Sequence, residues 1–192
     1  MIPKNTRKII LYLLRNLELV NINQISKNLD ISVGSAFKIL KELEKNNILL
    51  SSNLGNAKFY QINLKNEETI KWCEILLLEE KRNLKGYSKI YGDEIQRFEH
   101  AELIILFGSI LNNKEHNDID VLFVTNKPKE VTKFCLNLSK IRTKPLVPLI
   151  LKKEDFVNEI RNKKDVILNI IKTGIILKGA SIFLDVLKNA KQ

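Results

Sequence analysis

The feature that most constrains this 192-residue chain is a pair of apolar runs, residues 103–107 and 121–124, with a glycine and two aspartates between them. The first run, Leu-Ile-Ile-Leu-Phe, predicts a buried β-strand that stops at Gly108, because glycine commonly interrupts strands. The second run follows Asp118 and Asp120 directly. On an extended strand, side chains two residues apart project from the same face, so we expect these two carboxylates to lie side by side.

The chemistry of this stretch favours a metal ion and phosphate groups. Two adjacent carboxylates repel each other, and a divalent cation such as Mg²⁺ relieves the repulsion because hard cations prefer oxygen ligands. Gly108 and Ser109 offer backbone N–H groups and a hydroxyl at the start of a predicted short helix, where phosphates bind well. We therefore expect these residues to hold a metal ion together with a nucleoside triphosphate.

The order of strand, Gly-Ser pair, short helix and Asp-x-Asp resembles the nucleotidyltransferases of the DNA polymerase β superfamily, especially the small minimal nucleotidyltransferases of archaea and bacteria. The resemblance covers roughly residues 99–187. It implies that Gly108 and Ser109 bind the nucleotide phosphates. It also implies that Asp118 and Asp120 are the catalytic residues and bind Mg²⁺ or Mn²⁺.

The reaction implied by the resemblance is transfer of a nucleoside monophosphate from an NTP, with ATP as the expected donor, to an acceptor hydroxyl. Relatives of this size include antitoxins that modify a toxin, so a protein acceptor of that kind is one expectation. The sequence itself identifies neither the base nor the acceptor.

A departure from the family pattern leaves an alternative open. Family enzymes often carry a third carboxylate on the next strand, yet residues 145–151 contain no acid. Two metal ions held roughly 3.5–4 Å apart need enough anionic ligands, so the second metal site is expected to be weak. The leading hypothesis is an active nucleotidyltransferase. The alternative is a DNA-binding regulator whose nucleotidyltransferase-like domain is inactive and serves for nucleotide sensing or dimerisation.

Composition and charge limit the class of protein. Apolar residues make up 44% of the chain, as in ordinary globular proteins, and no apolar run approaches the roughly 20 residues that span a bilayer. The start of the chain lacks a signal-peptide pattern, so we expect a cytoplasmic protein with no membrane partner. The two cysteines, Cys73 and Cys135, lie in apolar patterns and are expected in the core. A net charge of +10 favours anionic partners.

The amino-terminal third predicts three helices followed by a β-hairpin. Apolar spacing indicates helices over 6–17 and 23–28, and Ser32 can cap a third helix. Two apolar strands then flank residues 53–56, where Gly55 suits a turn. This order, together with the sequence of the third helix, resembles the winged helix-turn-helix domains of many archaeal and bacterial transcription regulators.

That second resemblance implies DNA binding by four residues. Ser35, Lys38 and Lys41 would face the major groove from the third helix, and Lys58 on the wing would lie near a phosphate. Ten lysines and arginines against four acids precede Glu67, which agrees with an anionic partner. The alternative is a protein-contact module, because acids dilute the positive helix face.

The predicted fold class is therefore α+β. We expect a winged helix domain at residues 1–66, a helical connector at 67–98, and a small nucleotidyltransferase α/β domain with a mixed sheet at 99–192. The connector has no Pro-, Gly- or Ser-rich linker, so ordered packing or a homodimer contact is expected. His116 is interpreted as a solvent-exposed loop residue.

Overall fold

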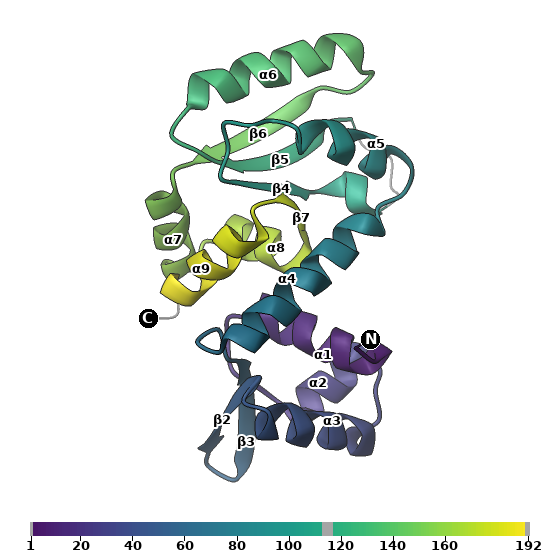
Figure 1. The fold of residues 1–192 in the computed structure, drawn as a ribbon, viewed down its shortest axis with the longest axis vertical. Coiled ribbons are helices and arrows are strands. Elements are labelled where there is room, and N and C mark those ends of the chain that lie inside the picture. The colour runs from purple at the N-terminus through teal and green to yellow at the C-terminus, as the bar shows by residue number, and fades with distance from the viewer. Residues whose placement is uncertain (1, 113–116, 191–192) are drawn as a thin grey trace. The chain divides into compact units, whose positions relative to one another are not determined.

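The computed structural model describes residues 2–112 and 117–190, so His116 lies outside the described residues (Figure 1). The chain divides into two compact units, Met1–Leu76 and Leu77–Gln192, and each has buried apolar residues of its own. Within the described ranges, no helix is both long and apolar enough to cross a membrane.

The first unit has the order helix, strand, helix, helix, strand, strand. Its elements are α1 (Lys4–Arg15), β1 (Val20–Asn21), α2 (Ile22–Leu29), α3 (Val33–Lys45), β2 (Leu49–Leu54) and β3 (Ala57–Ile62), followed by the start of α4 (Glu67–Arg82). The strands form an antiparallel sheet in the order β1-β3-β2. This is the winged helix-turn-helix arrangement that the sequence predicts. Strand β1 was missed because two residues are too few to show an alternating pattern.

Local signals explain how α3 and the hairpin form. The Ser32 hydroxyl accepts a hydrogen bond from the Ser35 backbone N–H at 3.3 Å, as expected for a helix cap. Strands β2 and β3 meet through Gly55, whose φ of 59° suits a tight two-residue turn. One side of α3 is buried through Ala36, Leu40 and Leu43, which leaves its opposite side exposed.

The second unit contains a mixed sheet covered by helices. Helix α5 (Gly86–Ile95) leads into β4 (Leu103–Phe107), a short 3₁₀ helix η1 (Ser109–Asn112), β5 (Ile119–Val124), α6 (Pro128–Ile141), β6 (Leu146–Leu151), α7 (Lys153–Arg161), α8 (Asp165–Thr173), β7 (Ile175–Lys178) and α9 (Ala180–Ala190). Figure 1 shows the strands in the order β6-β5-β4-β7. Only β5 and β6 are parallel, so the predicted mixed sheet and α+β class are confirmed.

Both faces of the two central strands are buried, which explains why their sequences are continuous apolar runs. One face carries Leu106 and Val121, which pack into a cluster with residues of α5 and α6. On the other face β4 contacts α8 and α9. Both cysteines are buried as expected, and burial raises the pKa of the Cys135 thiol to about 11. A thiol with this pKa is unreactive near neutral pH.

Candidate functional site

The centre of the candidate site is a close approach between Gly108 and Asp120. Strand β4 ends at Phe107, which pairs with Asp120 across the antiparallel ladder. Gly108 follows with a φ of 84°, and a Cβ placed on it would lie 2.2 Å from Oδ2 of Asp120. Only glycine therefore fits here, for both its backbone conformation and its lack of a side chain. The Gly108 backbone and the Asp120 carboxylate are thus brought together, and Ser109 follows as the first residue of η1.

The two aspartates interact electrostatically. Asp120 is half-buried on β5, and Asp118 lies in the bend just before the strand begins at Ile119. Burial raises the pKa of the Asp120 carboxyl, and the negative charge of Asp118 raises it further. Both effects disfavour the charged form of Asp120, and a bound cation would relieve both. The donor set of two carboxylates with oxygen ligands only suits a hard divalent cation.

Strand β6 supplies the position next to Asp120 in the sheet, and that position carries no carboxylate. The parallel register pairs Asp120 with Val147, so their side chains lie on the same face of the sheet. Val147 is 45% exposed on this edge strand, so a side chain at this position is accessible from solvent. Among the residues that the structure describes, no group of three or more His, Cys, Asp or Glu side chains could hold a metal ion.

The loop that precedes β6 is fixed at the same end of the sheet. The Tyr91 hydroxyl on α5 donates to the backbone oxygen of Lys144 at 3.2 Å and accepts from its N–H at 3.1 Å. Nearby, Arg142 forms an ion pair with Glu94 of α5, and the backbone oxygen of Pro145 accepts a hydrogen bond from the Ile119 N–H at 3.0 Å. The sequence analysis did not predict these contacts. The one indication in the sequence was a tyrosine within an apolar helix face, because a buried hydroxyl group requires a hydrogen-bond partner.

The four predicted DNA-binding residues lie in two different environments. Lys38 and Lys41 are exposed on α3, and Ser35 is half-buried near its start. Lys58, in contrast, forms an ion pair with Glu44 of α3 at 2.7 Å, and Ser51 also donates to that carboxylate. These contacts lower the pKa of Glu44, and the hydrogen bond to Glu44 raises the pKa of Lys58. The Lys58 charge is therefore already partnered within the domain.

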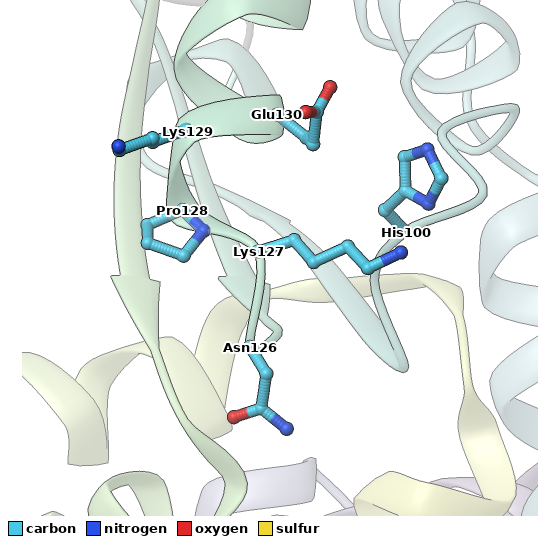
Figure 2. A pocket seen from close by; sticks show the side chains of 6 residues that line it. All are labelled: His100, Asn126, Lys127, Pro128, Lys129 and Glu130. Atoms are coloured by element: carbon cyan, nitrogen blue, oxygen red, sulfur yellow. The ribbon is translucent and has the colours of Figure 1, made fainter.

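A pocket of about 470 Å³ lies at the other end of the mixed sheet (Figure 2). It is lined by His100, before β4, by residues 126–127, which connect β5 to α6, and by residues 128–130 in the first turn of α6. In Figure 2 the Lys127 side chain extends in the direction of the His100 ring. Because Asp120 lies near the start of β5 and the pocket follows its end, this pocket is separate from the Gly108–Asp120 site.

A family comparison bears on the second unit. Residues 92–182 match the family model described as Polymerase beta, Nucleotidyltransferase. The matched stretch includes Gly108, Ser109, Asp118, Asp120 and Val147. The match supports a nucleotidyltransferase domain in this part of the chain.

Two solved structures of mutants of Lactococcus lactis ZitR are also similar to the chain. The first, a mutant in apo form, is 18% identical, with 72% of this chain and 82% of that chain covered and a TM-score of 0.36. The second mutant is 17% identical, with 71% and 73% covered and a TM-score of 0.35. Scores of this size do not establish a common fold. A search of curated proteins finds no match.

The close approach at Gly108 predicts a strong effect of a single methyl group. We expect Gly108→Ala to lower the free energy of unfolding by about 1–3 kcal/mol, because alanine is strained at positive φ and its Cβ displaces the Asp120 carboxylate. Urea denaturation measures the change. The matched control is Gly34→Ala on α3, where nothing lies within 4 Å of the added Cβ. Equal stability of the two variants would contradict the close approach.

The raised pKa of Asp120 predicts a pH-dependent cost. The pKa of Asp120 is higher in the folded protein than in the unfolded chain. Charged Asp120 therefore lowers the free energy of unfolding at a pH above its folded pKa. This loss of stability disappears at a pH below the usual aspartate pKa of about 3.9. We expect Asp120→Asn to stabilise the protein at pH 7, because the neutral amide carries no charge to be desolvated or repelled by Asp118. Urea titrations across pH measure the difference, which should shrink as the solution is acidified. A variant less stable than wild type at pH 7 would contradict this expectation.

Proposed function

We propose that the second unit transfers a nucleoside monophosphate from an NTP to an acceptor hydroxyl. The observation that carries this proposal is the close approach of Gly108 to Asp120, inside the stretch that matches the nucleotidyltransferase family. The acceptor hydroxyl would lose its proton to water, its oxygen would bond to the α-phosphorus of the NTP, and the bond to pyrophosphate would break so that pyrophosphate leaves. The family model and the geometry support this reaction class without identifying the acceptor.

Each residue of the site has a proposed role. Asp118 and Asp120 hold the divalent cation, Mg²⁺ or Mn²⁺, and Gly108 and Ser109 bind the phosphates. When bound, the cation supplies charge neutralisation at the phosphates. The residues of the chain contribute position and electrostatics: the glycine lets the backbone approach closely, and the two carboxylates lie at the edge of a buried sheet, where water screens their charges less. ATP is the first donor to test, and a protein, such as a toxin partner, the first acceptor.

One observation favours a second function. Val147 stands beside Asp120 where a third carboxylate would complete a two-metal site. A domain with this ligand set could bind a nucleotide without turning it over. The chain would then be a DNA-binding regulator whose nucleotidyltransferase domain senses nucleotide or mediates dimerisation. Incubation of the full chain with each labelled NTP, divalent metal and cell extract separates the two functions, because only the enzyme transfers label.

Restoring the missing carboxylate tests the proposed metal site directly. We expect Val147→Asp to lower the metal concentration needed for NTP binding or label transfer by roughly tenfold, because a third oxygen ligand faces the same ion. Val147→Asn is the matched control, since it has similar size without charge. Asp118→Asn and Asp120→Asn should each abolish metal-dependent NTP binding in calorimetry. Unchanged binding in both aspartate variants would refute the metal site, whatever the effect of Val147→Asp.

For the first unit we propose DNA binding through α3. Its exposed side carries Lys38 and Lys41, whereas its buried side packs into the domain core. The Glu44–Lys58 ion pair neutralises one acid and one base together, so the exposed Lys38 and Lys41 are what favour an anionic partner over the protein-contact alternative.

Substitution of Lys38 and Lys41 should change the salt dependence of DNA binding more than substitution of Lys58. We expect Lys38→Ala with Lys41→Ala to weaken duplex binding and to lower the slope of log affinity against log salt by about 0.9 for each phosphate contact that is removed. Lys58→Ala is the control, and should change the slope less because Glu44 already neutralises that charge. Fluorescence anisotropy over a salt series measures both. Wild-type protein that shows no salt-sensitive binding would assign this unit to protein contacts.

A further inference from the structure

Helix α3 exposes an aromatic side chain that the fold does not use. Phe37 is 53% exposed, and Val33, one turn earlier on the same side, is 48% exposed. The apolar residues that anchor the helix lie elsewhere on it, at Ala36, Leu40 and Leu43. Folding therefore gains little from Phe37, and an apolar pair on a helix surface indicates contact with a partner.

A glycine on the same exposed side is also unexplained by the fold. Gly34 lies within the first turn of α3, where glycine lowers helix stability relative to alanine. Nothing lies within 4 Å of a Cβ placed there, and its φ is not in the positive range. Neither packing nor backbone conformation within the described residues requires glycine at this position. A partner that comes close to the helix backbone would require it.

The charges around Gly34 and Phe37 indicate what kind of partner this side of α3 would bind. Gly34, Phe37, Lys38 and Lys41 lie within roughly 100° of the helix circumference, given 3.6 residues per turn. Both lysines are exposed, and the nearby Glu44 carboxylate is engaged by Lys58 and Ser51. Glu42 is also exposed on α3, but Lys38, Lys41 and Lys45 outnumber it. The side that carries Phe37 is therefore basic overall, and it complements a polyanion that also presents apolar groups. Duplex DNA is such a partner, because the thymine methyl group lines its major groove.

We propose that the first half of α3 reads thymine: Phe37 contacts the C5 methyl group of a thymine in the major groove, and Gly34 allows the helix to approach the base edges. This inference rests on the DNA binding proposed above and adds the base that is recognised. The first residues of a recognition helix are those that reach base edges, whereas lysines further along reach phosphates. Phe37 and Gly34 would therefore determine specificity, and Lys38 and Lys41 mainly affinity.

The test removes the methyl group from the DNA and the ring from the protein. Full-length protein first selects its preferred site from a library of random short duplexes. Each thymine of that site is then replaced singly by uracil, which lacks only the C5 methyl. We expect one replacement to weaken wild-type binding about fourfold, the effect of one buried methyl-sized group, and to leave Phe37→Ala binding unchanged. Ile75→Ala, which truncates a 52% exposed residue on α4, should keep the full uracil effect.

Gly34→Ala supplies an independent arm. This variant should raise the melting temperature of the protein, because alanine favours helix and meets no neighbour, yet weaken binding to the selected site about fivefold or more. A more stable protein that binds DNA less tightly is not expected from a purely structural role. Unchanged affinity in Gly34→Ala would overturn the close approach to the bases.

The remaining outcomes separate this inference from the DNA binding on which it rests. Salt-sensitive binding with no selected site, or a uracil effect that persists in Phe37→Ala, would overturn thymine reading and leave DNA binding in place. Absence of any salt-sensitive binding by wild-type protein would overturn both. A uracil effect that disappears only in Phe37→Ala would establish the contact.

Discussion

The close approach of the Gly108 backbone to the Asp120 carboxylate is the constraint on which the candidate site depends. Two requirements meet at one residue, because φ is positive there and a Cβ would lie 2.2 Å from a carboxylate oxygen. The turn proposed to present backbone N–H groups to phosphates is thus held against the side chain proposed to bind metal. Any side chain at position 108 would disturb both halves of the site together.

The mixed sheet holds this arrangement in place. β4 and β5 are buried on both faces, so a shift by one residue would exchange their side chains between the two cores and disturb the close packing of each. The antiparallel register of β4 and β5 pairs Phe107 with Asp120. The parallel register of β5 and β6 places Val147 next to Asp120 on the neighbouring strand. The charged site therefore lies at the end of a buried apolar sheet. Partial burial there disfavours the charged form of Asp120, which is why the pKa of its carboxyl is raised.

Sequence patterns predicted the features that depend on neighbouring residues along the chain. The apolar runs at 103–107 and 121–124 are strands or parts of strands, and Ser32 caps α3. Contacts between distant residues carried no such signal. The ion pair of Lys58 with Glu44 joins residues on a strand and a helix, and the pairing of Val147 with Asp120 depends on a register that no local pattern encodes. Their consequences became visible only in the folded chain.

The missing third carboxylate would couple metal and nucleotide binding in both of the proposed functions. With only Asp118 and Asp120 proposed as protein ligands, much of the oxygen coordination of a second ion would have to come from the triphosphate. Each ligand then raises the affinity for the other by the same factor, as linkage requires. An enzyme would use this coupling to load metal only with substrate, and a sensor would use it to respond to nucleotide at a given metal level. Both functions therefore share one binding equilibrium and differ in whether the bound nucleotide is turned over, so turnover decides between them and affinity does not.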